Sequence, residues 1–301
     1  MDDPRLILGL ALSSAHVDAA IIDSAGKILV RAQLRLPDYD TMAGLLPLWI
    51  EYATALGKPL AAKYAPLAVG VAAEGHYHPQ TGVLRGGLSS DPALKNYPLK
   101  EKLSAALHLP VFIENAFKAV TLAELHYGAG KGCQHVIAVN MDADISGAII
   151  LNGRLYHGSN GLAGQAGQLI TFDSGVWLEE VSSGEALVFE AESSGLIEEG
   201  ATEEAVFERA RAGSRTARKL VRDAGEQVGR ALAGLTHLLD PERLLIGGVV
   251  GLQPETLKAV NQGLKECLLP AHKHLRAEPM QLGVDARLLG AAVQVFANHS
   301  A

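Results

Sequence analysis

The chain opens twice with the same order of predicted strands, and this repeat limits the folds that it can adopt. Each opening reads as a short apolar strand, a second strand, a turn and a third strand. The first opening has strands at residues 6–10, 17–22 and 27–36, and the second has strands at residues 136–139, 146–151 and 154–156. Two hairpin units of this kind predict an α/β protein with two mixed sheets that flank a cleft.

The remaining pattern fits such a protein. Helical periodicity covers Met42–Leu56 and Thr216–Leu239, and Leu67–Ala72 and Leu244–Ile246 read as buried strands. With 301 residues, of which 48% are hydrophobic and 20% charged, the chain is large enough for two domains.

Charge and cysteine content exclude several classes of protein. The formal net charge of −7 argues against non-specific binding of nucleic acid or of a membrane surface. No apolar run approaches the length of a membrane span, and the start Met1–Pro4 is acidic, unlike a secretory signal. The two cysteines, Cys133 and Cys267, make no disulfide framework. We therefore expect a cytoplasmic protein without direct nucleic-acid or membrane partners.

Several short motifs, in one order along the chain, carry a family resemblance. They are Gly128-Ala129-Gly130, Asn152-Gly153, Gly158-Ser159-Asn160-Gly161-Leu162-Ala163-Gly164, Leu178-Glu179-Glu180-Val181-Ser182-Ser183-Gly184, residues 240–248 and residues 285–292. The chain resembles the ROK family (repressors, open reading frames and sugar kinases) of the actin-like ATPase, or ribonuclease H-like, superfold. The resemblance implies a smaller domain of residues 1–116 plus 289–301, a larger domain of residues 117–288, and a homodimer.

The phosphate-binding loops depart from the pattern of the family's kinases. Their first loop is Asp-x-Gly-Gly-Thr, whereas this chain has Ala11 for the aspartate, serines for the glycines and Ala15 for the threonine. Their second loop is Gly-Thr-Gly-x-Gly, whereas this chain carries Asp142 and Asp144. Like charges beside a triphosphate are unfavourable unless a cation intervenes. These two aspartates are either relocated magnesium ligands or residues of a solvated turn.

The catalytic base of the family is also missing. Its kinases carry Glu-Asn-Asp-Ala, and the aspartate deprotonates the sugar hydroxyl, whereas this chain has Ala116 at that position. General-base catalysis typically contributes about 10²–10⁴-fold to a rate. Lys118 is expected to be protonated and Glu114 to point to the other side of its strand. We therefore expect no catalytic residue and no reaction by the family mechanism.

A zinc site is not expected either. The family's zinc histidine is replaced by Gln168, and its cysteine run is replaced by Phe172–Trp177, which contains no cysteine. The sequence His76-Tyr77-His78 is either a surface loop or, as the alternative, a different metal site. We predict no metal and no cofactor.

The groups that remain can contact a polyol. By resemblance, the sugar-binding residues are Asn115, Asn160, Gly161, Gln165 and Glu179. The alternative is that Asn115 and Glu179 cap helices.

A nucleotide contact is implied more weakly. In the family, the residues at the positions of Gly247 and Gly248 lie near the adenosine, although a glycine pair also marks a simple turn.

Two functions follow from these patterns. The main prediction is a catalytically silent sugar sensor, regulator or scaffold, which resembles the effector domain of the family's repressors without their helix-turn-helix. The alternative is a divergent carbohydrate kinase of the glucokinase, N-acetylglucosamine kinase or N-acetylmannosamine kinase type. Only this alternative requires ATP and magnesium.

Overall fold

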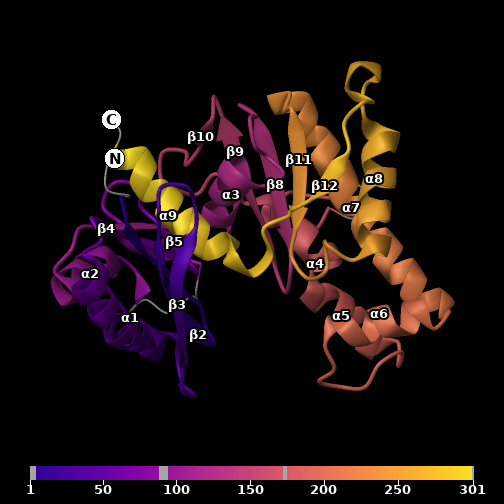
Figure 1. Ribbon diagram of the computed structural model, residues 1–301. Helices are drawn as coiled ribbons and strands as arrows, with labels where there is room; N and C mark the ends of the chain where they lie inside the picture. The colour runs from indigo at the N-terminus through magenta and orange to yellow at the C-terminus, as the bar shows by residue number, and fades with distance from the viewer. Residues whose placement is uncertain (1–4, 88–93, 172–174, 300–301) are drawn as a thin grey trace. The chain divides into compact units, whose positions relative to one another are not determined.

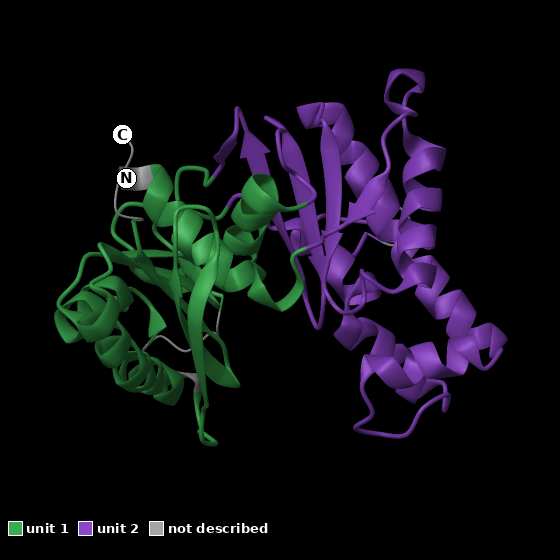
Figure 2. Cartoon of the chain, in the orientation of Figure 1, with its two compact units in different colours: residues 1–128, 157–162, 282–301 green, residues 129–156, 163–281 purple. Residues whose placement is uncertain are grey.

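A computed structural model describes residues 5–87, 94–171 and 175–299 of the chain. It divides into two compact units (Figure 2). Unit 1 comprises residues 1–128, 157–162 and 282–301, and unit 2 comprises residues 129–156 and 163–281. Each unit contains one five-stranded mixed sheet, which confirms the predicted fold class. Among the described residues, every helix is too short or too polar to span a bilayer.

The sheet of unit 1 has the strand order β3-β2-β1-β4-β7, of which β2, β3 and β4 are labelled in Figure 1. Strands β1, β2 and β3 are antiparallel neighbours, whereas β4 runs parallel to β1 and β7 runs parallel to β4. The strands are β1 (Ile7–Leu12), β2 (His16–Ile22), β3 (Ile28–Arg35), β4 (Ala68–Ala73) and β7 (Val111–Asn115), with a separate hairpin of β5 (His76–Tyr77) and β6 (Leu84–Gly86). The helices are α1 (Met42–Tyr64), α2 (Leu99–Leu107), α3 (Ala116–Tyr127) and α9 (Ala286–His299), with a 3-10 turn η4 (Gly283–Asp285) before α9.

Both faces of this sheet are covered at its centre, because β1 and β4 carry only apolar residues and glycine and are buried at every position. Leu8, Leu10 and Leu12 of β1 belong to the core beneath α1 and α2. The alternate residues Ile7 and Ala11 belong to the core beneath α9. The period of two along β1 therefore assigns one row of side chains to each helical layer.

The sheet of unit 2 has the order β10-β9-β8-β11-β12 and repeats the same arrangement. Strands β8, β9 and β10 are antiparallel neighbours, and β11 lies parallel to β8 and β12. The strands are β8 (Val136–Met141), β9 (Ile145–Leu151), β10 (Arg154–Leu155), β11 (Arg243–Gly247) and β12 (Ala277–Pro279). The helices are η2 (Ala166–Gln168), α4 (Leu178–Ser182), α5 (Gly184–Ser193), α6 (Glu203–Arg211), α7 (Arg215–Leu239), α8 (Pro254–Cys267) and η3 (Pro270–His272).

Helix α3 belongs to unit 1, although the sequence pattern ended the first domain at residue 116. An ideal Cβ on Gly290 of α9 would lie 1.8 Å from the carbonyl oxygen of Ala119, so α3 and α9 are in backbone contact there. Leu282, just before α9, donates its N–H to Glu124 of α3 at 2.8 Å. These contacts explain where the compact unit ends, and the predicted domain boundaries remain a prediction.

One local prediction is wrong. The segment His76–His78 was expected to be a surface loop, but His76 and Tyr77 form strand β5. Tyr77 is buried, and its hydroxyl donates a hydrogen bond to the carbonyl oxygen of Glu74 at 2.6 Å. The apolar body of the tyrosine ring accounts for the difference, because it packs into the core beneath α1 and α2.

Candidate active site

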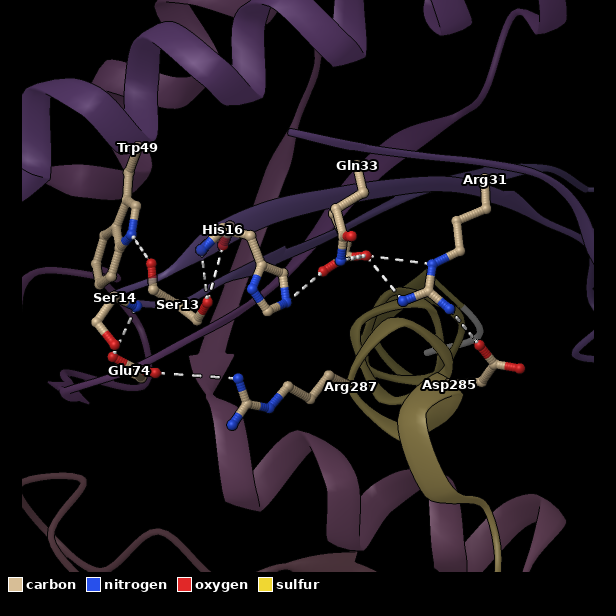
Figure 3. Close-up of polar contacts among 10 residues, drawn as sticks. Ser13, Ser14, His16, Arg31, Gln33, Trp49, Glu74, Asp285 and Arg287 are labelled. Atoms are coloured by element: carbon tan, nitrogen blue, oxygen red, sulfur yellow. Dashed lines mark hydrogen bonds and ion pairs between the residues drawn. The ribbon is translucent and has the colours of Figure 1, made fainter. Parts of the chain in front are cut away.

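The turn between β1 and β2 corresponds to the expected first phosphate-binding loop. Its backbone is already engaged: the Ser13 N–H bonds the carbonyl oxygen of His16 at 3.1 Å, and the Ser14 N–H bonds Glu74 Oε2 at 3.2 Å. The ring N–H of Trp49 donates to the Ser13 carbonyl oxygen at 2.8 Å (Figure 3). The turn is therefore fixed by contacts from β4 and α1 as well as by its own hydrogen bonds.

A buried carboxylate lies beside the position of the missing aspartate. Ala11 pairs directly with Asp18 on β2, so the two side chains share one face of the sheet. Asp18 Oδ1 accepts hydrogen bonds from Arg31 Nη2 at 2.8 Å and from Gln33 Nε2 at 3.0 Å, and Oδ2 lies 3.2 Å from His16 Nε2. Because Arg31 and Gln33 already donate to Oδ1 and the His16 ring lies against Oδ2, this carboxylate has little capacity left for a metal ion.

The arginine and its neighbours extend this cluster. Arg31 Nη1 bonds Asp285 Oδ1 at 2.9 Å, and Arg287 Nη1 lies 3.9 Å from Glu74 Oε1. Figure 3 shows these side chains on the strands and at the start of α9. Acidic and basic groups alternate, so each guanidinium lies against at least one carboxylate.

The second expected phosphate loop lies between β8 and β9 in unit 2. Asp142 Oδ2 accepts from Asn140 Nδ2 at 2.9 Å, and its Oδ1 accepts the N–H of Val249. Burial and the neighbouring Asp142 carboxylate raise the pKa of Asp144. Within the described residues, no group of three histidine, cysteine, aspartate or glutamate side chains is placed to hold a metal ion. The contacts of Asp142 favour the turn interpretation over a relocated metal ligand.

Close backbone packing explains why glycine is needed at the end of β11, at Gly247 and Gly248. Gly248 has φ of +89°, and an ideal Cβ on it would lie 2.1 Å from the carbonyl oxygen of Met141. Gly247 is the last residue of β11 and pairs with Asn140 of β8. The pair therefore makes the close turn out of the sheet, and its contact with a nucleotide remains a prediction.

Asn115 joins the end of β7 to the start of α3. Its Oδ1 accepts the N–H groups of Phe117 at 3.0 Å and Lys118 at 3.1 Å, so it caps the helix. Its Nδ2 donates to the carbonyl oxygen of Gly75 at 2.8 Å. The structural role proposed as the alternative is therefore present, and a sugar contact would be additional to it.

Residues 157–162 return to unit 1 and pack beside this helix start. Lys118 Nζ, which is buried, donates to the carbonyl oxygen of Gly161 at 2.6 Å. Gly161 has φ of +79°, and a Cβ there would lie 2.3 Å from the carbonyl oxygen of Tyr77. Burial lowers the pKa of Lys118, and the nearby Glu114 carboxylate opposes this shift. Asn160, the preceding residue, is exposed.

An imidazole and a carboxylate meet at the same place. His157 Nε2 lies 2.6 Å from Glu114 Oε2. The Glu114 side chain is 10% exposed and that of His157 is 31% exposed, so the pair runs from a buried carboxylate to an accessible ring. The sequence did not suggest this pair because its members are 43 residues apart and Glu114 was expected to face away. The position of His157 directly before the glycine loop was the only available signal.

The other predicted sugar-binding residues lie in unit 2. Glu179 accepts a hydrogen bond from Gln168 Nε2, and an ideal Cβ on Gly167 would come within 2.5 Å of Glu179 Oε2. Burial raises the pKa of Glu179, against the effect of the Gln168 hydrogen bond. Glu179 does not cap α4, because Glu180 Oε2 accepts the Trp177 N–H at 2.9 Å. Gln165 precedes the turn η2.

The expected zinc position is only partly described. Residues 172–174 of the cysteine-free run lie outside the described residues. Gln168 is exposed and bonded to Glu179. The prediction of no zinc stays a prediction.

Comparisons with known proteins match this chain to the ROK family and to named sugar kinases. A model of the ROK family matches residues 7–297. The N-acetylmannosamine kinase of Haemophilus influenzae is 29% identical, and the alignment covers 96% of this chain and 94% of that enzyme. The bifunctional enzyme NanE/NanK of Brucella melitensis is 34% identical over 65% of this chain, which spans only 37% of that enzyme. A ROK family glucokinase from Streptomyces griseus, solved in complex with glucose and AMPPNP, is 25% identical and has a TM-score of 0.77 over 95% of this chain and 98% of its own.

These relatives confirm the resemblance and correct the predicted function. The predictions of a catalytically silent sensor, regulator or scaffold, and of no cofactor, are wrong, because relatives matched over nearly the whole chain are named as kinases. The prediction of a silent protein considered catalytic groups only at the positions where the family's kinases carry them. The structure shows two other titratable groups near Ala116. Glu114 lies two residues before it in sequence, and His157, which is 43 residues from Glu114, contacts the Glu114 carboxylate.

Proposed function

Because this chain belongs to the ROK family, we propose that it is a carbohydrate kinase, which transfers the terminal phosphoryl group of ATP to a sugar hydroxyl. The observation that carries the proposal is the similarity to a named sugar kinase over 96% of this chain and 94% of that enzyme. The local geometry is compatible with this function, since the glycine loop around Gly161 is held in place by Lys118.

We propose N-acetylmannosamine as the first sugar to test, because a relative named for that substrate matches nearly the full chain. Asn115, Asn160 and Gly161 of unit 1 are the proposed sugar contacts in that unit, and Gln165 and Glu179 are those in unit 2. Amide groups suit this task because they both donate to and accept from hydroxyl groups, and carboxylates because they accept from them. In this proposal Gln165 keeps the hydrogen-bonding capacity of an acid without its charge.

Magnesium is proposed to enter as part of the nucleotide substrate. Asp18 and Asp142 both have their oxygens engaged by protein donors, and no metal-binding group of three side chains exists among the described residues. These residues do not fit a resident magnesium ion, so we assign it no ligand in the chain. Gly247 and Gly248 are the proposed nucleotide contacts, on the family resemblance alone, since the space beside Gly248 is taken by the backbone of Met141. A homodimer, expected from the family, can be tested by light scattering.

The kinase activity is tested with purified protein, MgATP and separate sugars, with ADP release as the readout. The sugars are N-acetylmannosamine, N-acetylglucosamine and glucose. We expect turnover with at least one of them and no ADP release without sugar. If none of the three is phosphorylated, and direct detection of the sugar phosphate agrees, the proposal is refuted.

A matched pair of variants tests the sugar contact in unit 2. Glu179→Gln removes a charged hydrogen-bonding group, for which a loss of about 1.5–3 kcal/mol corresponds to a rise of about 10- to 150-fold in the KM for sugar. Glu208→Gln makes the same change at an exposed position of α6 and should leave KM within about twofold. Equal KM values for the two variants would remove Glu179 from the sugar site.

A further inference from the structure

We propose that His157 is the general base of this kinase and that Glu114 is the residue that positions it. This inference rests on the proposed function, because a general base needs a hydroxyl to activate. It answers the question raised by Ala116, whose methyl group cannot accept a proton. Both residues belong to unit 1, together with Asn115 and Gly161 of the proposed sugar site.

The carboxylate is fixed at both oxygens. Glu114 Oε1 accepts the N–H of Asn115 at 2.8 Å, and Oε2 lies 2.6 Å from His157 Nε2. A buried carboxylate that accepts from one ring nitrogen selects the tautomer with its proton on that nitrogen. The other nitrogen, Nδ1, then presents a lone pair.

Within the described ranges, no hydrogen bond to Nδ1 of His157 is formed, and the ring is 31% exposed at its side chain. An oriented and accessible imidazole, held by a buried acid, is the arrangement that general-base catalysis requires.

The other titratable groups near the start of α3 are less suitable. Lys118 is 3% exposed, and its ammonium donates to the carbonyl oxygen of Gly161. Although burial lowers the pKa of Lys118, its nitrogen is shielded from a substrate. Glu74 is held at the β1–β2 turn, where it accepts the Ser14 N–H and lies near Arg287. His157 is the group that combines a fixed orientation with exposure.

The proposed step transfers a phosphoryl group from ATP to the sugar hydroxyl. The sugar hydroxyl gives its proton to Nδ1 of His157 while its oxygen forms a bond to the terminal phosphorus of ATP. The bond between that phosphorus and the bridging oxygen breaks, and its electron pair leaves with ADP. The imidazolium, stabilised by Glu114, then releases the proton to solvent. The products are a sugar phosphate, ADP and a proton.

The first test compares His157→Gln with His274→Gln. Glutamine can still donate an amide hydrogen bond to Glu114, but it cannot take up a proton. We expect kcat to fall by about 10²–10⁴-fold while the KM for sugar changes by less than about threefold. His274 is an exposed histidine in unit 2, and its replacement should leave both constants unchanged.

Two further measurements separate a chemical role from a structural one. His157→Ala should regain at least about tenfold of its lost kcat when imidazole is added, because the free base can enter the vacated space. Glu114→Gln should lower kcat by itself, but should cost at most about threefold more when added to His157→Gln, because the two residues act as one unit.

The outcomes distinguish the two proposals. If the natural protein phosphorylates a sugar but His157→Gln keeps its kcat within about threefold, His157 is not the base and the kinase assignment stands. A loss of kcat in His157→Ala that imidazole does not restore, with fully additive effects of Glu114→Gln, also overturns the assignment of the base. If the natural protein turns over no sugar, the kinase proposal fails and this inference falls with it.

Discussion

Replacing Gly290 by alanine tests the packing of α3 against α9, on which the core of unit 1 depends. Gly290 is buried within α9, and an ideal Cβ there would lie 1.8 Å from the carbonyl oxygen of Ala119 and 2.3 Å from its carbon. Both atoms belong to the backbone of α3, so no side-chain rotation can relieve the overlap. The helices would have to separate by about 1.6 Å, the difference between 1.8 Å and the 3.4 Å at which ordinary contact begins.

The expected cost follows from two opposing effects. Alanine in a helix interior is favoured over glycine by about 1 kcal/mol. Overpacking of a dense core costs about 1–3 kcal/mol, and a clash between two backbones belongs at or above the upper end of this range. We therefore expect Gly290→Ala to lower the free energy of unfolding by about 2 kcal/mol. For a chain of 301 residues, whose unfolding entropy is about 0.6 kcal/mol/K, that corresponds to a fall in Tm of about 3 °C.

Gly44→Ala is the matched control in the same unit. Gly44 lies in the first turn of α1, is exposed, and its ideal Cβ would meet only ordinary contacts at 3.7 and 3.9 Å. This variant should be as stable as the natural protein or slightly more stable. Thermal and urea unfolding followed by circular dichroism measure both effects. A Gly290→Ala protein that unfolds at or above the Tm of Gly44→Ala would refute the close contact of α3 with α9.

Two further predictions concern charged groups of unit 1. Asp18→Asn should lower the free energy of unfolding by about 2 kcal/mol, which is less than for a fully buried ion pair because Arg31 is partly exposed. Asp285→Asn, which changes the exposed carboxylate that contacts the same arginine, should lower it by less than about 1 kcal/mol. Equal losses for the two variants in urea unfolding would contradict the buried network. Burial and then Lys118 lower the pKa of His76, so stability should decline as pH falls through the ordinary histidine range, where the unfolded chain takes up the proton first. Lys118→Met should raise the His76 pKa in an NMR titration, and an unchanged value would rule out the coupling of these two groups.

The fold could be predicted from the sequence because its signals are local. Each sheet begins with antiparallel neighbours joined by short turns, so alternating apolar strands and Asn152-Gly153 were sufficient to place them. The extent of α7 could also be predicted, because its residues have strong helical periodicity. The observed helix, Arg215–Leu239, begins one residue before the predicted helix and ends at the same residue. The resemblance to the ROK family is confirmed for the same reason, since its glycine motifs are contiguous in sequence.

The candidate site was predicted less well because it depends on distant pairs. The β1–β2 hairpin is short, so the position of Asp18 opposite Ala11 could have been inferred from the sequence. The hydrogen bonds that Arg31 and Gln33 of β3 donate to Asp18 could not. The contact of His157 with Glu114 joins segments that no periodic pattern relates. The substitutions at aligned positions therefore led to a wrong conclusion about function.

The division of unit 1 into separate stretches of sequence affects how the protein can fold during synthesis. Leu282 bonds Glu124 across 158 residues, and Gln294 donates to the carbonyl oxygen of Val71 across 223 residues. The sheet of unit 1 is translated early, but the helix that covers one of its apolar faces follows only after unit 2. Contacts between such distant segments form slowly because the closure of a long loop costs entropy. Ile7, Ala20 and Ile22 consequently lack the α9 part of their core until unit 2 has been made, and we expect this interval to favour aggregation of the nascent chain.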